Sequence, residues 1–111
     1  MPEYRTRAAL ALKDGTIVPR GATLTVNWNR ENPGGASVAV WHRPPADGGP
    51  RTLKLGARHL GRLVAGRLPT LEECQEWTFD SVCETPSGDT VEPDGWSADG
   101  EPSWLLILGL L

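Results

Sequence analysis

Two cysteines and two histidines are the side chains best suited to nucleophilic or metal chemistry. Cys74 and Cys83 are nine positions apart, which matches neither a Cys-x-x-Cys pair nor the paired spacings of a structural zinc site. His42 and His59 both lie among arginines, and no carboxylate is spaced to orient either imidazole as a general base. We therefore expect two small buried thiols here, and no catalytic or metal centre.

The other candidate catalytic or binding residues do not lie in the sequence motifs that such sites use. Ser103 lies in Pro-Ser-Trp and not in the Gly-x-Ser-x-Gly turn of a hydrolase nucleophile. The glycine-rich stretches 33–35 and 48–50 lack the helix and the lysine that follow a phosphate-binding loop. The acids near the C-terminus do not alternate as calcium-loop ligands do, so they predict a solvated acidic loop: Asp89, Glu92, Asp94, Asp99 and Glu101. The sequence thus predicts a protein that is not an enzyme and carries no cofactor or metal.

Charge divides the chain into two unequal parts. All 11 Lys and Arg lie in residues 1–68 beside four acids, a net charge of +7, whereas residues 69–111 carry ten acids and no Lys or Arg, a net charge of −10. We expect the two parts to neutralise each other within one fold. The alternative is an open basic face for an acidic partner such as nucleic acid.

Length and composition favour one small domain. The 111 residues have room for a single hydrophobic core, and the 13 glycines and 10 prolines favour short strands joined by turns. We expect one domain over 1–111, with a basic β-rich part (1–68) and an acidic part (69–111) of helix, hairpin and apolar tail. The apolar stretches are too short for a signal peptide or a membrane span, which predicts a cytoplasmic protein with reduced thiols and no membrane contact.

Strand patterns run through residues 1–68. In the stretch 22–29, Leu24, Val26 and Trp28 alternate with polar residues, which is the pattern of a half-buried strand. A turn at 31–35 separates it from an expected hairpin partner over 38–42. We also expect extended pieces over 7–13 and 16–19, a third strand over 51–56 with Leu53 and Leu55 inward, and a short helical turn over 57–63. This order of short strands and turns, followed by a helical turn, resembles the Src-homology-type small barrels.

The clearest local signal predicts a helix over about 70–80. Thr70 can cap the helix while Glu73 reaches back to the Thr70 amide, which is a capping box. We expect Leu71, Cys74, Trp77 and Phe79 to form its apolar side. The fold class is therefore mainly β with some helix (α+β): a small Src-homology-like bent β-barrel or sheet with one short capped helix and a docked apolar C-terminus.

The C-terminal part should contain a second hairpin and an apolar end. Segments 82–85 and 90–92 flank a turn, and a further turn is expected over 92–95. The run 104–108 is too apolar for a free tail, so we expect it to dock as a short helix or last strand. The alternative is an exposed surface for a partner. The candidate core anchors or apolar interface residues are Trp96, Trp104, Leu105 and Leu106.

The chain from residue 71 onward resembles short uncharacterised proteins encoded by bacteria and their phages. These share an LEEW-like helix, a VEPDG turn and a PSWLLxLGLL end, and the likeness covers about the last third of this chain. The resemblance implies a phage or mobile-element context and no assigned activity. Some members carry Cys and His where this chain has residues 96–101 without either, which argues against a metal role. The matching residues are Leu71, Glu72, Trp77, Val91, Glu92, Pro93, Asp94, Gly95, Pro102, Ser103, Trp104, Leu105, Leu106, Leu108, Gly109 and Leu110.

Two classes of function remain. The first is a protein-interaction module from a phage or mobile element, such as an inhibitor or adaptor of a host complex, and we expect a protein partner. The alternative is a nucleic-acid-binding barrel with exposed Trp28 or Trp41 for base stacking. The oligomeric state is left open. The candidate partner or nucleic-acid face comprises Arg43, Arg51, Lys54, Arg58, Arg62 and Arg67.

Overall fold

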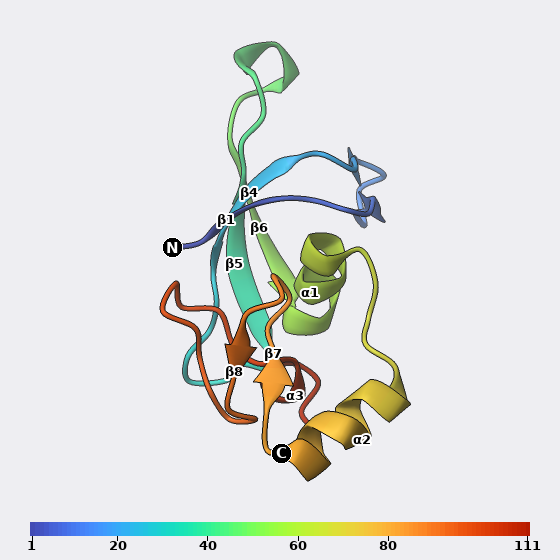
Figure 1. Cartoon of the computed structure of the whole chain (residues 1–111). Helices are drawn as coiled ribbons and strands as arrows, with labels where there is room; N and C mark the ends of the chain where they lie inside the picture. Colours follow the sequence, from blue (N-terminus) through green and yellow to red (C-terminus); the bar gives the residue numbers. More distant parts are fainter.

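A four-stranded antiparallel sheet forms the centre of the computed structural model, which describes residues 1–111 (Figure 1). The strand order is β1-β4-β5-β6, so the sheet is open, with β1 and β6 as its two edges. The structure thus confirms a small, mainly β protein with a few helices. The strands are β1 (Glu3–Arg5), β4 (Thr23–Asn27), β5 (Ala36–Trp41) and β6 (Arg51–Gly56).

The predicted hairpin of the central sheet is confirmed. β4 pairs with β5, and Leu24, Val26 and Trp28 are buried on one face as their alternation predicts. On β6, Leu53 is buried and Leu55 is half-buried, which also agrees with the prediction. The tip of the β5–β6 hairpin carries a short 3-10 helix, η1 (Pro45–Asp47), and projects beyond the rest of the molecule (Figure 1).

Two small hairpins accompany the sheet. β2 (Leu10–Ala11) pairs with β3 (Ile17–Val18), so the extended pieces expected over 7–13 and 16–19 contribute only two paired residues each. β7 (Cys83–Glu84) pairs with β8 (Thr90–Val91), which confirms the second hairpin. The turn over 92–95 is also present, because the Gly95 amide donates to the Glu92 carbonyl at 2.8 Å.

The structure has more helix than predicted. α2 (Leu71–Asp80) begins with the expected capping box, in which Thr70 and Glu73 exchange hydrogen bonds of 3.1 Å. However, residues 57–65 form a full helix, α1 (Ala57–Ala65), and the apolar end forms α3 (Trp104–Ile107). The first of these is longer than the predicted helical turn over 57–63, and the second is the helical one of the two alternatives predicted for the apolar end. Burial of the α1 residues Leu60, Leu63 and Val64 against the core stabilises the helix despite its internal glycine.

The predicted apolar side of α2 is wrong at two positions. Cys74 is buried and Trp77 is half-buried, but Leu71 and Phe79 are 71% and 89% exposed. Phe79 lies five positions after Cys74, which turns it about 140° away around the helix axis. Because α2 packs on the fold mainly through β7, only the narrow stripe around Cys74 reaches the core.

The apolar C-terminal segment is docked. Trp104, Leu105 and Ile107 are buried where α3 packs on α1 and β7, while Leu106 is half-buried. The exposed-tail alternative therefore applies only to the final residues, since Leu110 and Leu111 are exposed. None of the helices is both long and apolar enough to span a bilayer.

Candidate functional site

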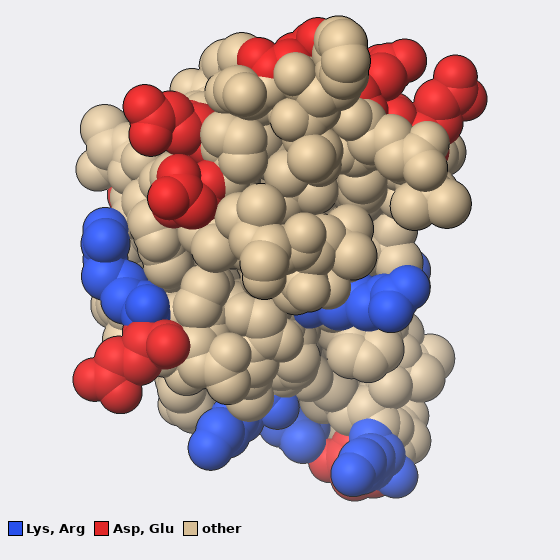
Figure 2. Space-filling view, turned by 90° about the horizontal axis from the view of Figure 1, so that it is seen from below, with Lys and Arg blue, Asp and Glu red and all other residues tan.

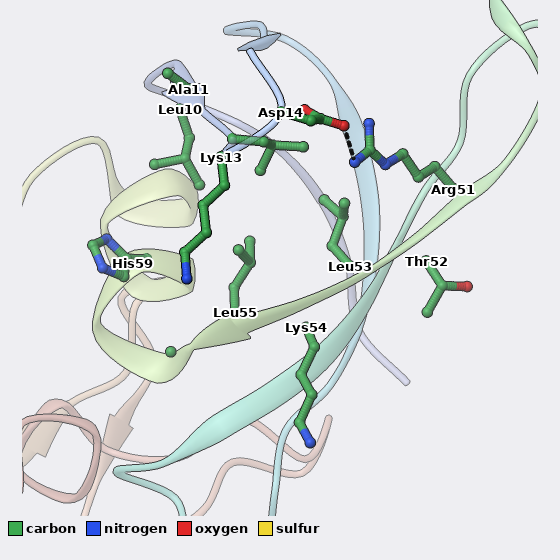
Figure 3. Close-up of a pocket in the computed structure, with 12 residues that line it drawn as sticks. Leu10, Ala11, Lys13, Asp14, Arg51, Thr52, Leu53, Lys54, Leu55 and His59 are labelled. Carbon is green, nitrogen blue, oxygen red and sulfur yellow. Dashed lines mark hydrogen bonds and ion pairs between the residues drawn. The ribbon is translucent and has the colours of Figure 1, made fainter. Parts of the chain in front are cut away.

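An open groove of about 570 Å³ lies between the edge strand β6, the segment 10–14 and the start of α1 (Figure 3). The segment 10–14 contains β2 and the turn after it, which places it beside a strand about 40 residues further along the chain. Asp14 and Arg51 connect the two walls at one end of the groove through an ion pair of 2.8 Å.

The interior of the groove is apolar. Leu53 and Leu55 project from the same face of β6 because alternate residues of a strand share a face, and Figure 3 shows both between the two walls. Leu10 and Leu12 line the opposite wall and are half-buried. Leu10, Leu12 and Leu55 thus leave an apolar surface that the core covers only in part, while Leu53 below them is buried.

The rim of the groove is cationic. Lys13 and His59 are exposed at the groove, Lys54 is exposed on the outer face of β6, and the side chain of none of them makes a hydrogen bond or ion pair with a groove residue. Figure 3 shows the Lys13 side chain between His59 and Leu55, over the apolar interior. The groove is therefore suited to a ligand that combines apolar side chains with negative charge.

The only acid of the groove is already paired. The Thr16 amide donates to Asp14, as does Arg51, and these two interactions lower the pKa of Asp14 to about 2. Asp14 therefore stays ionised at neutral pH and balances the charge of Arg51. The charges of Lys13 and Lys54 are not balanced in this way.

Most of the predicted basic face is engaged within the fold. Arg43 lies over the Trp41 ring at 5.1 Å and donates to the Gly49 carbonyl, and Arg51 pairs with Asp14. Arg62 donates to the Ala9 carbonyl at 3.2 Å. Only Lys54 and Arg58 of the six predicted residues make no such contact. Arg67, the last residue of the predicted face, forms an ion pair with Glu73 at 2.7 Å.

The predicted base-stacking tryptophans are not available at the surface. Trp28 is 3% exposed and Trp41 is 8% exposed, so both belong to the core. Burial of Trp28 agrees with the predicted alternation, and burial of both side chains argues against the nucleic-acid alternative, which uses an exposed Trp28 or Trp41. Another predicted residue, Trp96, is half-buried, and the Arg30 guanidinium lies 4.5 Å from its ring centroid.

Few charges of the two parts of the chain pair directly. Seen from the end that carries α2 and α3, many acidic side chains lie along one edge, while basic side chains lie across the middle and along the opposite edge, with some acidic side chains among them (Figure 2). A single ion pair, Arg67–Glu73, joins residues 1–68 to residues 69–111. Neutralisation of the two parts therefore involves little direct ion pairing.

One acid predicted to be solvated is buried. Glu101 is 2% exposed, and its carboxylate accepts hydrogen bonds from the Tyr4 hydroxyl and from the Ser87 amide and hydroxyl at 2.7 and 2.8 Å. Burial, followed by the Glu101 carboxylate, raises the pKa of Tyr4 well above its usual range. The alternation of Glu3-Tyr4-Arg5 is the sequence signal for an inward tyrosine, but no pattern pointed to Glu101.

The predicted thiols are both buried and free. Cys74 and Cys83 form no disulfide, and burial raises the pKa of the Cys74 thiol. The structure holds no group of three or more His, Cys, Asp or Glu side chains positioned to bind a metal ion. Comparison of the chain with protein-family models, curated proteins and solved structures found no match.

Proposed function

We propose that this chain is a non-enzymatic protein-interaction module that binds a segment of a partner protein in the groove beside β6. The observation that carries the proposal is the juxtaposition of four leucines with the exposed Lys13 and His59 at the groove, and with Lys54 on the outer face of the same strand. Partly exposed apolar surface with a polar rim is typical of interaction sites. A protein segment can supply both the apolar side chains and the negative charge that such a surface takes.

Nucleic-acid binding is the alternative, and it has weaker support. Phosphate recognition depends on several Lys and Arg side chains that are free to face the backbone of the nucleic acid. Four of the six basic residues named for this role bond within the fold, and Trp28 and Trp41 are buried. The acidic edge of the molecule would also repel phosphate.

The proposal includes a biological setting. The likeness of the C-terminal third to short phage and bacterial proteins supports an origin in a phage or mobile element, with an inhibitor or adaptor of a host complex as the role. A cytoplasmic location agrees with this role. The likeness of the strand rhythm to Src-homology-type small barrels supports a binding function at the level of fold alone.

The proposal can be tested by affinity capture from a nuclease-treated bacterial lysate. We expect one defined protein to co-purify with the wild-type chain and to be lost with Leu55→Glu, which places a charge inside the groove. Phe79→Glu is the matched control, because it adds the same charge to an exposed apolar residue on α2. Circular dichroism and thermal melting should show that both variants are folded.

Two outcomes would contradict the proposal. Loss of the partner with Phe79→Glu but not with Leu55→Glu would place the interaction at the exposed end of α2. Loss of every captured protein on nuclease treatment, with nucleic acid recovered from untreated samples, would favour the nucleic-acid alternative.

A further inference from the structure

We propose that the partner binds as an added β-strand: an extended acidic segment pairs with the free edge of β6 and inserts alternate apolar side chains into the groove. This inference rests on the proposed function, since it specifies the kind of segment that the groove takes. The observations that carry it are the hydrogen-bond register of the sheet, the position of the leucines and the charges at the rim.

The register identifies which backbone groups of β6 are free. The Ala57 amide donates to the Gly35 carbonyl, and the pairing of β5 with β6 continues from this point. Residues 51, 53 and 55 therefore exchange hydrogen bonds with β5, because bonded and non-bonded pairs alternate along an antiparallel ladder. The His42 amide donates to the Thr23 carbonyl, so the even-numbered residues of β5 form their backbone hydrogen bonds with β4. The odd-numbered residues of β5 are then the ones that bond to β6, in agreement with the register above.

The backbone groups of Thr52 and Lys54, and the Gly56 amide, consequently point away from the sheet. β6 is an edge strand, and none of these groups bonds to the hairpin of β2 and β3 or to any loop. An edge with unpaired N–H and C=O groups is a template for another strand. The free edge spans about 13 Å from Thr52 to Gly56, which suits a segment of about five residues.

The groove lies where the side chains of such a strand would point. Side chains of an added strand alternate between the two faces of the sheet, as those of β6 do. On the inner face they would meet Leu53 and Leu55 as cross-strand neighbours, with Leu10 and Leu12 on the opposite wall. On the outer face they would lie beside Thr52 and Lys54, which are exposed.

The charges select an acidic segment. Lys13 and His59 stand at the groove, Lys54 lies on the outer face, and the single acid of the groove is held by Arg51 and Thr16. Acidic residues that alternate with the apolar anchors would therefore meet Lys54 on the outer face, and negative charge close to the anchors would also be attracted by Lys13 at the groove. Opposite charges on neighbouring strands are favourable, whereas like charges are destabilising.

A second copy of this chain fits the edge less well. In the antiparallel register that joins the outward-facing groups of two β6 strands, Lys54 lies opposite the same lysine of the second copy. Like charges directly opposite each other disfavour that pairing, and a lysine on an edge strand is a common device against self-association. We therefore assign the edge to a different, acidic chain.

The first experiment is a titration of the isotope-labelled protein with the synthetic peptide acetyl-Glu-Val-Glu-Leu-Glu-Val-Glu-amide, followed by NMR. We expect the amide protons of Thr52, Lys54 and Gly56 to shift and to exchange more slowly with solvent. Those of Leu53 and Leu55 already bond to β5 and should keep their exchange rates. The peptide with Lys in place of each Glu should bind at least fivefold more weakly at low salt.

Two further probes separate backbone pairing from charge. N-methylation of the peptide amide that faces the Lys54 carbonyl removes one hydrogen bond and should weaken binding about tenfold, and this result does not depend on folding of a protein variant. Lys54→Gln removes the charge alone and should weaken binding only a few-fold. Lys54→Pro also removes the outward-facing amide, which an edge strand tolerates, and should weaken binding at least tenfold more than Lys54→Gln.

The outcomes distinguish this inference from the proposed function. If a captured partner is lost with Leu55→Glu but is unaffected by Lys54→Pro, the groove is used without strand addition and the inference is wrong, while the proposed function stands. If the peptide shifts amides away from β6, or does not bind at millimolar concentration, the inference is also wrong. Dimerisation of the wild-type chain through β6 in sedimentation experiments would assign the edge to a second copy and overturn it.

Discussion

The hydroxyl of Tyr4 donates a hydrogen bond to the carboxylate of Glu101, and this contact joins the first strand to the C-terminal segment 97 positions later. Trp28 donates its indole N–H to the same hydroxyl at 3.0 Å, and Ser87 supplies two donors to the carboxylate. Every polar atom of this buried cluster has a partner. A buried carboxylate without a cation depends on such donors, so the cluster connects four separate segments of the chain.

Tyr4→Phe should destabilise the fold by about 2 kcal/mol, because it leaves both the Trp28 N–H and the Glu101 carboxylate with one partner fewer. Urea denaturation measures the change. The matched experiment repeats Tyr4→Phe in a Glu101→Gln background, where we expect a coupling of at least about 1 kcal/mol. Strictly additive effects of the two substitutions would mean that the contact does not contribute to stability.

Gly61→Ala should destabilise the protein although alanine favours helix formation. A Cβ atom at Gly61 would lie 2.6 Å from the Trp104 ring, so α1 and α3 would have to separate, at a cost of about 1–3 kcal/mol. In a Trp104→Phe background the clashing ring atoms are absent, and Gly61→Ala should cost much less. Equal losses of melting temperature in both backgrounds would show that the close packing of Gly61 on Trp104 is not the cause.

Thr70→Ala should lower the free energy of unfolding by about 1 kcal/mol, because the Thr70 hydroxyl accepts the Glu73 amide at the start of α2. Thr70→Ser keeps the acceptor and is the matched control, with a loss of a few tenths of a kcal/mol at most. Chemical denaturation of the two variants checks this. A stability of Thr70→Ala equal to that of the wild type would mean that the cap is not needed.

The contribution of Glu73 should depend on pH. The Arg67 guanidinium and the Thr70 amide lower the pKa of Glu73 from 4.5 to about 2, so its ionised form stabilises the fold above about pH 4.5. This contribution should disappear as the pH falls through about 2. Comparison of the wild type with Glu73→Gln should show a stability difference at pH 6 that shrinks toward pH 2. A difference that is constant over this range would contradict the ion pair.

Binding of a mixed-sequence oligonucleotide should be undetectable at about 0.15 M salt, where exposed charges are screened within about 8 Å. The reason is that four of the six residues of the predicted basic face bond within the fold and that the acidic edge opposes phosphate. Fluorescence anisotropy over a salt series measures this, with Arg58→Ala and Arg62→Ala as variants. Because Arg62 donates to Ala9, its substitution should lower the melting temperature more than that of Arg58. Micromolar binding at this salt concentration would support the nucleic-acid alternative.

Some features of the fold could be read from short stretches of sequence. The capping box at Thr70 depends on residues three positions apart, and the alternation of Leu24, Val26 and Trp28 depends on residues two positions apart. The length of helix α1 was not evident from the sequence, because Gly61 and the absence of a capping side chain weaken its local helix signal, while its stability comes from packing. Phe79 was predicted to lie on the apolar side of α2, but it is exposed. The width of the helix surface that contacts the core depends on the neighbouring elements and cannot be read from the helix sequence.

The hairpins, the capped helix and the uneven distribution of charge along the chain follow from neighbouring residues and from counts of residue types, so the sequence alone was enough to predict them. The first strand, β1, was not predicted. The burial of Glu101, the bonding of four predicted basic residues within the fold and the position of Leu10 and Leu12 opposite Leu53 and Leu55 became evident only in the folded chain. The tertiary structure also decided that the outer side of β6 stays unpaired. The contacts of Glu101 with Tyr4, of Arg62 with Ala9 and of Arg51 with Asp14 join residues 97, 53 and 37 positions apart, and no local pattern specifies which distant segments meet when the core closes.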